Sequence, residues 1–390
     1  MSETALGRFT ARALNCRAMT GEFTGDLAQA VVDLDAVAYN VAVIRAATAA
    51  EVMAVVKADA FGHGMVPVAR AALGAGATWL GVTSAAEALH LRAEGITAPI
   101  LSWLHGPGTD FDRLIAADVD ISVPAVAYLD AVSQAARRAG RARVHLKIDT
   151  GLARNGAAPS GWPALVARAA AAEREGLLEV RAVWSHLAEA GSQVAPFRAA
   201  LAVAQAAGLR PRLRHLANSA AALSDPDTHF DMVRAGLGIY GVEPVGGRRY
   251  GLRVAMTVRT SVVLVKRVPA GTGVSYHHTH TTSRSTTLAL IPMGYADGIP
   301  RTVDGRAQVL LHGRRCPIVG RVSMDQCVVD AGDLPVRLGD PVVVLGSGDG
   351  GEPTAAEWAR WAGTNPHEIL TGIGARVPRR HLSLVTEAVR

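Results

Sequence analysis

Lysine is rare in this chain, and its positions point to chemistry that needs an amine. Only three of the 40 Lys and Arg residues are lysines, namely Lys57, Lys147 and Lys266. Arginine stays protonated in proteins, whereas a desolvated lysine loses its proton and attacks a carbonyl carbon. Lys57 follows the apolar run Ala54-Val55-Val56 and precedes Phe61-Gly62-His63-Gly64, which predicts a reactive amine at the end of a buried strand. The alternative is a lysine that reaches solvent from that strand end.

Four further segments place polar residues where buried strands are expected to end. They are residues 147–154, 185–186, 215–219 and 233–241. Each segment is weak evidence by itself, because a single histidine at a strand end is more often a hydrogen-bonded core residue. The glycines in 236–241 have the spacing of a dinucleotide fingerprint, but they do not open a βαβ unit, so we discount that interpretation. Together, the five strand ends indicate one shared site.

The elements that must position these residues are buried strands alternating with helices. From residue 28 to about residue 241, short apolar runs without strict alternation are followed by Ala-rich helical patterns. About eight such repeats predict a closed, TIM-like (β/α)8 barrel, in which reactive groups lie at the C-terminal ends of the strands. The expected strands are 52–56, 80–82, 100–103, 119–123, 144–148, 180–186, 214–217 and 230–234. The expected helices are 35–48, 65–73, 85–94, 125–139, 160–174 and 195–207.

A second domain of different character follows the barrel. After residue 251, short strands are separated by Gly, Pro and Asp, and helical periodicity persists only near 354–362. This pattern predicts a mainly antiparallel β domain. We therefore expect an N-terminal extension at 1–27, the barrel at 28–248 and the β domain at 249–390, with a possible extra strand for the β domain within 1–25. The expected strands of the β domain are 254–269, 286–291, 307–311, 316–319, 326–330 and 341–345.

The bulk composition argues against several classes of function. Hydrophobic residues make up 49% of the 390 residues, which is enough for large cores and argues against disorder. The net charge is +6, but basic residues do not cluster and aromatic residues are only 5%, so nucleic-acid binding is poorly supported. The three cysteines show no disulfide or metal spacing, and neither a signal peptide nor a membrane span is recognisable. We expect a soluble, cytoplasmic protein.

Six motifs follow one another along nearly the whole chain, from residue 31 to residue 379. They are Val55-Val56-Lys57-Ala58-Asp59, Lys147-x-Asp149-Thr150-Gly151, Asn218-Ser219, Gly273-Val274-Ser275-Tyr276, Gly294-Tyr295-Ala296-Asp297-Gly298 and Val322-Ser323-Met324-Asp325-Gln326. In this order and at this spacing they resemble the alanine racemases, enzymes of fold type III that depend on pyridoxal 5′-phosphate (PLP). That family has an N-terminal (β/α)8 barrel and a C-terminal β domain, so the resemblance implies the same architecture and the same cofactor.

The resemblance implies two groups that move protons. Lys57 is expected to carry PLP as a Schiff base and to act as one acid/base group. Tyr276 is expected to act as the second from the partner subunit, so that a head-to-tail homodimer shares its active sites. Racemisation needs such a pair, because a proton leaves Cα on one face and returns on the other. The implied reaction is the racemisation of a small amino acid, by default L-alanine to D-alanine.

The resemblance also implies the residues that support the cofactor ring. Arg234 is expected to hydrogen-bond the pyridine nitrogen, and a guanidinium, which only donates, keeps that nitrogen unprotonated. The ring is then a weaker electron sink, which limits side reactions. His215 is expected to orient Arg234, and His186 with Arg234 is expected to support Tyr276.

The expected phosphate site departs from the family pattern at two positions. By resemblance, a loop or helix start holds the phosphate through Asn218, Ser219, Gly236 and Leu237. Two tyrosines that donate to the phosphate in the family are replaced here by Phe61 and His367. A hydrogen bond to a charged group contributes roughly 1.5–3 kcal/mol, so we expect weaker PLP binding, although His367 is itself a donor.

The substrate is expected to lie between both domains. By resemblance, Arg154 and the backbone at Met324 bind the substrate carboxylate beside Asp325, and Tyr295 lines the entry. Lys147 matches a lysine that is carbamylated in many relatives, where it fixes the arginine corresponding to Arg154. An ordinary pair between Lys147 and an aspartate is the alternative.

Three departures surround the expected substrate side chain, namely Phe61, His367 and a shortened segment after His186. They prompt the hypothesis that a larger or polar amino acid replaces alanine as substrate. The histidines at 277, 278 and 280 resemble a metal site, but no carboxylate or cysteine completes it, so we predict no metal.

Two other kinds of protein share this scaffold. A PLP enzyme that decarboxylates or cleaves its substrate by a retro-aldol reaction needs no second base on the opposite face, so the presence of Tyr276 with His186 and Arg234 disfavours it. A non-catalytic PLP-binding barrel protein lacks the β domain that this chain has.

Overall fold

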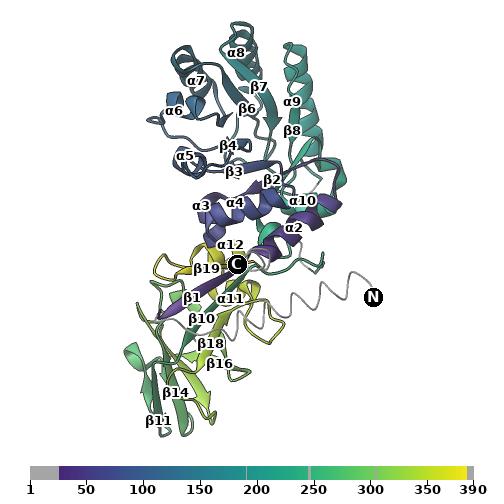
Figure 1. Ribbon diagram of the computed structural model, residues 1–390. Coiled ribbons are helices and arrows are strands. Elements are labelled where there is room, and N and C mark those ends of the chain that lie inside the picture. Colours follow the sequence, from purple (N-terminus) through teal and green to yellow (C-terminus); the bar gives the residue numbers. More distant parts are fainter. Residues whose placement is uncertain (1–25, 190, 245–246, 304, 384–390) are drawn as a thin grey trace.

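The chain folds into a barrel and a β domain, each with its own apolar core (Figure 1). The computed structural model describes residues 26–383 except 190, 245–246 and 304. The possible strand within residues 1–25 lies outside the described residues. Both expected architectures are confirmed, an eight-stranded parallel barrel and a mainly antiparallel sheet.

All eight barrel strands expected from the sequence are present, with ends that differ by at most two residues. Their order is β8-β7-β6-β5-β4-β3-β2-β9. Two backbone hydrogen bonds connect the outer strands, from Asp231 N–H to Arg214 O and from Arg234 N–H to Ala217 O, both 3.0 Å. The strands are β2 (Glu51–Val55), β3 (Trp79–Val82), β4 (Ile100–Ser102), β5 (Asp120–Val123), β6 (Ala142–Lys147), β7 (Leu178–Trp184), β8 (Leu213–His215) and β9 (Met232–Ala235).

Helices cover the outside of the barrel, and the six helices expected from the sequence are confirmed. Two further helices, α6 and α10, have six residues each, which is too short to display a helical period. None of the helices in the described part of the chain is both long and apolar enough to cross a membrane. The helices are α2 (Leu34–Ala46), α4 (Met65–Gly74), α5 (Ala85–Ala93), α6 (Phe111–Ala116), α7 (Val126–Ala139), α8 (Trp162–Arg174), α9 (Val194–Ala206) and α10 (Ser219–Ser224). The 3₁₀ turns η1 (Pro226–Thr228) and η2 (Leu237–Tyr240) accompany them.

The β domain is built on a nine-stranded sheet of order β11-β14-β17-β16-β15-β18-β10-β1-β19. Its strands are β1 (Ala28–Asp33), β10 (Met256–Ser261), β11 (Leu264–Val268), β14 (Thr286–Ile291), β15 (Gln308–Leu311), β16 (Arg314–Val319), β17 (Cys327–Gly332), β18 (Pro341–Leu345) and β19 (Arg379–Leu382). Smaller elements are β12 (Gly273–Val274), η3 (Tyr276–His278), β13 (His280–Thr281), η4 (Arg301–Val303), α11 (Ala355–Ala362) and α12 (Pro366–Thr371).

Residues 28–33 lie in this second sheet, although the sequence analysis assigned them to the barrel domain. The strand β1 is antiparallel to β10, with Ala30 opposite Val258, and parallel to β19, with Ala30 opposite Arg379. Ala30 and Val32 are fully buried. We expected β1 in the barrel because it directly precedes the barrel in the sequence, whereas its strand partners lie more than two hundred residues away. The first described strand therefore ties the start of the chain to the β domain.

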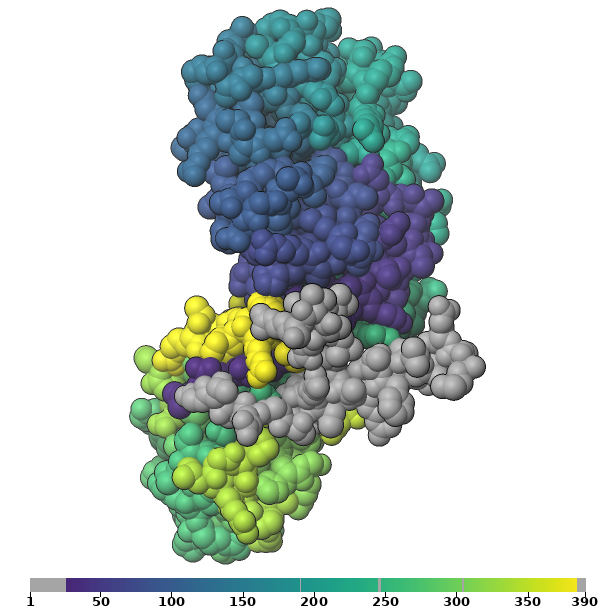
Figure 2. All heavy atoms as spheres, viewed as in Figure 1, coloured from purple at the N-terminus to yellow at the C-terminus, as the bar shows by residue number. Residues whose placement is uncertain are grey.

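The two domains meet where the C-terminal segment packs on the turn after β2. A Cβ atom on Gly62 would lie 2.7 Å from the Leu370 carbonyl oxygen of α12. The Arg379 side chain donates to Gly62 O at 2.8 Å, and His381 Nε2 lies 2.7 Å from His63 O. Figure 2 shows this C-terminal segment, in yellow, between the β domain and the N-terminal part of the barrel. The junction therefore adjoins the segment that begins with Lys57.

Candidate active site

Lys57 begins a left-handed backbone turn. In α3 (Lys57–Gly62), residues 58–61 have φ between 50° and 54° and ψ between 38° and 52°. This left-handed turn costs about 1–2 kcal/mol for each non-glycine residue, so other contacts must hold it. Glu87 Oε1 accepts the Ala58 N–H at 2.7 Å, and Asp59 Oδ1 accepts the Met65 N–H at 2.7 Å. Strain of this kind concentrates at functional sites.

The Lys57 amine lies among cationic and aromatic groups. Burial, and then the positive charge of Arg154, lowers the pKa of Lys57, while Glu87 opposes the shift. Its Nζ atom is 5.8 Å from the centre of the Trp103 ring. A lowered pKa increases the fraction of neutral amine near neutral pH, and the neutral amine is the form that attacks a carbonyl carbon.

Lys147 is the last residue of β6 and is only 4% exposed. Burial, and then the charges of Arg234 and Arg154, lowers its pKa to about 7, against the opposing effect of Asp149. Its Nζ atom lies 4.1 Å from the centre of the Trp184 ring. The neutral form of the Lys147 amine is therefore accessible near neutral pH.

The loop after Lys147 explains the motif Asp149-Thr150-Gly151. Asp149 Oδ1 accepts the N–H groups of residues 151, 152 and 153 at 2.9–3.2 Å, which curls the loop that carries the exposed Arg154. A Cβ atom on Gly156 would lie 2.6 Å from Asp149 N, so a glycine is required there. Within the described residues, no ion pair joins Asp149 to Lys147.

Arg234 connects two of the predicted histidines. It lies on β9, is 4% exposed, and directs Nη1 to His215 Nδ1 and Nη2 to His186 Nδ1, both at 3.2 Å. Because a guanidinium only donates, both Nδ1 atoms accept, and each neutral imidazole carries its proton on Nε2. Burial, and then the charge of Arg234, lowers the pKa of His186 to about 3 and that of His215 well below its usual value. Burial also lowers the pKa of Arg234 to about 9. The Nε2–H of His186 is thus a neutral donor.

Ser219 forms a cradle with two glycine amides. Its Oγ accepts the N–H of Gly236 at 2.8 Å and that of Gly238 at 3.2 Å, so the hydroxyl proton remains available to an acceptor. Leu237 lies between these glycines at the start of η2. Asn218 caps α10 instead, since its Oδ1 accepts the Ala221 N–H at 3.1 Å.

The two family departures, Phe61 and His367, lie together beside this cradle. Their ring centres are 5.6 Å apart, and a Cβ atom on Gly236 would lie 3.4 Å from the Phe61 ring. Phe61 also packs on Tyr240, with ring centres 4.8 Å apart, and the Tyr240 hydroxyl donates to Val55 O at 2.9 Å. Burial, and then Lys57, lowers the pKa of His367. A side chain of the β domain thus reaches the mouth of the barrel in the same chain.

Gln193 organises the short segment that follows His186. Its Oε1 accepts the Ala188 N–H at 2.5 Å, and its Nε2 donates to His186 O at 2.9 Å and to Thr150 Oγ1 at 2.7 Å. Gln193 is 2% exposed. It therefore joins the loop after β7 to the loop that carries Arg154.

The β domain brings two of the predicted motifs together. Tyr295 N–H donates to Ser323 O and Ala296 N–H donates to Met324 O, both at 3.0 Å. The Arg376 guanidinium binds Asp325 Oδ1 at 2.7 Å and also the Asp297 carboxylate at 3.0 Å. Tyr295, Met324 and Asp325 therefore form one surface.

The predicted second base is on the surface of the same domain. Tyr276 is 66% exposed, Met324 53% and Tyr295 42%. Within residues 26–383, as far as they are described, no hydrogen bond or ring contact joins Tyr276 to Lys57. The structure thus groups the barrel residues into one cluster and leaves Tyr276 apart from it.

Comparisons with known proteins match this arrangement domain by domain. The family model described as alanine racemase, N-terminal domain, matches residues 32–244, and the model described as alanine racemase, C-terminal domain, matches residues 255–381. The chain belongs to the alanine racemase family.

Members of the alanine racemase family align with nearly the whole chain. The alanine racemase of Salinispora arenicola is 55% identical over 364 residues, which is 91% of this chain and 98% of the relative. The alanine racemase of Thermobifida fusca is 50% identical over 369 residues, 92% of this chain and 99% of the relative. The crystal structure of alanine racemase from D-cycloserine-producing Streptomyces lavendulae is 49% identical, with a TM-score of 0.91, and the match covers 94% of this chain and 100% of that one.

Alanine racemases depend on PLP, and the barrel cluster of this chain fits an anionic, carbonyl-bearing cofactor. Lys57, Lys147, Arg154 and Arg234 gather around His186, and positive charge from these neighbours lowers the pKa of each of Lys57, Lys147 and His186. Ser219 retains a hydroxyl proton beside two glycine amides. The cluster therefore combines an amine able to react with a carbonyl and a surplus of positive charge.

Sequence reasoning missed two residues that shape this racemase site. Glu87 holds the left-handed turn, and the capping-box pattern of Ser84 with Glu87, confirmed at the start of α5, was a local signal for its position. Gln193 carried no signal, because its partners come from two other loops.

Proposed function

We propose that this chain interconverts L-alanine and D-alanine with PLP as its cofactor. The observation that carries the proposal is the Lys57 amine, with its lowered pKa, within a cluster of cations at the mouth of a barrel. The names of relatives that are 50–55% identical support alanine as the substrate. They favour it over the larger amino acid hypothesised from Phe61 and His367.

The cofactor would be held at both of its ends by the barrel. Lys57 would bond covalently to its carbonyl carbon, and Arg234 would donate to its ring nitrogen. The Ser219 hydroxyl, held by the Gly236 amide, and the Leu237 amide would bind its phosphate. When bound, PLP supplies a conjugated ring that spreads the electron pair released at Cα. His367 is our candidate for the phosphate donor that Phe61 cannot supply.

Two bases on opposite faces would exchange the Cα proton. Lys57 would take or return it on one face, and Tyr276 of the partner subunit would do so on the other. The Nε2–H of His186 would donate to the tyrosine oxygen and stabilise its deprotonated form. The exposure of Tyr276 supports this assignment, because a base that must reach another subunit is uncovered in a single chain.

The substrate carboxylate would be bound from both domains. Arg154 offers a charged fork, and Met324, Asp325 and Tyr295 form the opposing surface of the β domain. We further propose that Lys147 takes up carbon dioxide, because a buried amine with a pKa of about 7 is available in neutral form. The resulting carbamate would attract Arg154 and offset the local excess of positive charge.

Isotope exchange in deuterated water tests the reaction and the substrate together. Each L-amino acid is incubated with the holoenzyme, and chirality and Cα deuterium are measured. Alanine should racemise at least about tenfold faster than any larger amino acid, because pocket discrimination of about 1–3 kcal/mol per methylene is typical. A Tyr276→Phe variant should retain bound cofactor and lose racemisation. Deuterium uptake without inversion, or a faster larger substrate, would contradict the proposal.

A further inference from the structure

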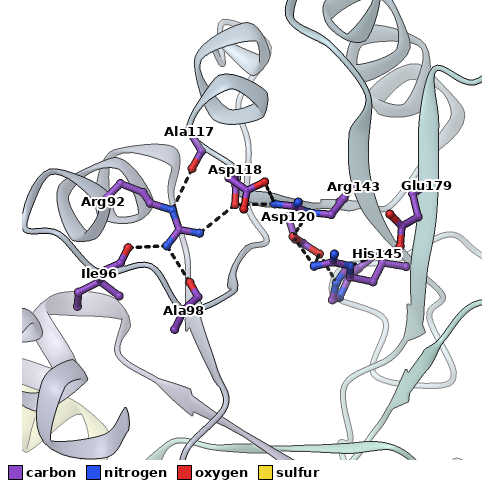
Figure 3. A network of polar contacts seen from close by, with 10 residues as sticks. Arg92, Ile96, Ala98, Ala117, Asp118, Asp120, Arg143, His145 and Glu179 are labelled. Carbon is purple, nitrogen blue, oxygen red and sulfur yellow. Dashed lines mark hydrogen bonds and ion pairs between the residues drawn. The ribbon is translucent and has the colours of Figure 1, made fainter. Parts of the chain in front are cut away.

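A chain of buried polar contacts runs from Arg234 into the barrel interior. Arg234 Nη1 lies 3.2 Å from His215 Nδ1, His215 Nε2 lies 3.0 Å from His145 Nδ1, and His145 Nε2 lies 3.0 Å from Asp120 Oδ2. The four residues belong to β9, β8, β6 and β5. His215, His145 and Asp120 are fully buried. We call these four residues the buried relay, and Figure 3 shows its Asp120 end.

Hydrogen-bonding chemistry gives the buried relay a single direction. Arg234 only donates, so His215 Nδ1 accepts and the His215 proton sits on Nε2. That proton is donated to His145 Nδ1, so the His145 proton also sits on Nε2. It is donated in turn to Asp120, which as a carboxylate only accepts. If either imidazole carried its proton on Nδ1, or on both ring nitrogens, two N–H groups would point at each other.

The far end of the relay keeps its negative charge through two arginines. Arg143 Nε lies 2.9 Å from Asp120 Oδ1 (Figure 3). Arg181 Nη1 lies 3.3 Å from the same carboxylate. Burial favours the neutral acid, but the hydrogen bond from His145 and the charges of Arg181 and Arg143 together hold the pKa of Asp120 below its usual value. Asp120 is therefore a permanent acceptor.

Aromatic packing keeps the imidazole rings of His215 and His145 from flipping. The Trp184 ring stacks on His215, with ring centres 5.2 Å apart and planes inclined by 14°. The edge of Trp79 meets His145, with ring centres 5.4 Å apart. Trp184 itself is held, since its Nε1 donates to Ser122 Oγ at 3.1 Å. The orientation of both histidines is thus fixed by packing, and their proton positions by the two ends of the relay.

We propose that Asp120 and His145 are positioning residues for Arg234. They keep the proton of His215 on Nε2, so that Nδ1 faces Arg234 as an acceptor and aligns the guanidinium. This inference rests on the proposed function, in which Arg234 donates to the ring nitrogen of the cofactor. Buried polar groups that only filled space would be better replaced by apolar ones, since each desolvated group costs free energy.

The Asp120→Asn variant is the sharpest perturbation. Arg143 and Arg181 only donate, so the new amide oxygen turns toward them and the amide N–H turns toward His145. His145 must then accept on Nε2 and carry its proton on Nδ1, which forces the same change on His215 and removes the acceptor from Arg234. The substitution hardly changes volume, so its main effect is on proton positions.

Nitrogen-15 NMR of the holoenzyme labelled at histidine reads those positions directly. In the wild type, His215 and His145 should both have a bare Nδ1 and a proton on Nε2. The signals are assigned with His145→Gln and His215→Gln. If either histidine of the wild-type enzyme is charged, or carries its proton on Nδ1, the proposal is wrong, whatever the variants show. This readout needs no turnover, so it stands apart from a failure of the racemase assignment.

Kinetics with a matched control separate positioning from simple loss of stability. Asp120→Asn should move both protons to Nδ1 and lower kcat about tenfold, with the KM for alanine changed less than about twofold, because Arg234 is not assigned to the substrate carboxylate. Arg143→Lys loses the guanidinium contact with Asp120 Oδ1 but keeps a positive charge there and leaves Oδ2 for His145, so proton positions and kcat should not change. The proposal would be wrong if both variants lost the same melting temperature and neither changed its kcat or its histidine tautomers. The relay would then only stabilise the fold.

Discussion

The barrel and the β domain contribute to the candidate site in opposite ways. In the barrel, Lys147 and Arg234 are each 4% exposed and His215 is fully buried, and Arg234 has three hydrogen-bond partners. On the β domain, Tyr276 is 66% exposed and Met324 53%. Burial restricts these three barrel side chains, whereas Tyr276 and Met324 on the β domain remain exposed.

Under the proposed function, the barrel half of the site is complete within a chain, and a second copy would cover the β-domain half. The barrel half shifts the pKa of its own side chains through burial and mutual positive charge. His367 is an exception, because α12 delivers it from the β domain to Phe61 within the same chain. Each half can therefore be perturbed separately.

Mixing two inactive variants tests the division of labour most strongly. Lys57→Ala lacks the barrel base and Tyr276→Phe lacks the β-domain base, so each alone should lose racemase activity by about a thousandfold or more. A heterodimer restores one complete site, and an equal mixture with free exchange should recover roughly a quarter of wild-type activity. Mixtures that contain heterodimers by native mass spectrometry and stay inactive would show that the two bases belong to one chain.

Removing carbon dioxide probes the barrel half through Lys147. Its pKa of about 7 means that the amine is mostly protonated below neutral pH and mostly neutral above it. Activity lost in buffer free of carbon dioxide, about tenfold to a hundredfold, should return on adding carbon dioxide. At a fixed concentration of dissolved carbon dioxide it should return faster at about pH 8 than at about pH 6, because more of the amine is neutral. Carbon-13 NMR with labelled bicarbonate should show a carbamate. Lys147→Met should show neither the signal nor the recovery.

Exchanging one ring at the cradle tests the departure from the family pattern. Phe61→Tyr adds a hydroxyl beside Gly236 and should slow cofactor loss about tenfold, through one hydrogen bond to a charged phosphate. His367→Phe should speed the loss. The measurement is the visible absorbance retained during dialysis. A wild-type enzyme that keeps all of its absorbance through prolonged dialysis would remove the reason for the prediction.

A substitution at the junction between the two domains should change the activity least and should mainly lower the melting temperature. Gly62→Ala introduces a Cβ atom 2.7 Å from Leu370 O, at a φ of +78°. Gly95→Ala meets the same backbone strain at +80°, with no atom within 4 Å. Gly62→Ala should therefore unfold about 2–3 °C below Gly95→Ala in calorimetry, since the clash adds about 2 kcal/mol and the entropy of unfolding scales with chain length. Equal melting temperatures would mean that the junction yields without cost.

Local sequence patterns were sufficient for the architecture and for most of the barrel cluster. Apolar runs between turn residues located all eight barrel strands, because strand burial and helix periodicity are read over a few residues. Lys57 and Lys147 lie in two of the motifs, and the resemblance to the alanine racemases singled out Arg234 at a strand end. Even His145 was within reach, since it lies two positions before Lys147 on β6 and so shares its face.

Tertiary structure decided whatever depends on partners distant in the chain. The left-handed turn of residues 58–61 is held because Glu87 accepts the Ala58 N–H and Asp59 accepts the Met65 N–H, whereas the residue types alone favour a right-handed turn. The strand β1 joins the β domain because its partners are β10 and β19. The direction of the buried relay follows from a guanidinium at one end and a carboxylate at the other, which only the closed barrel brings into line.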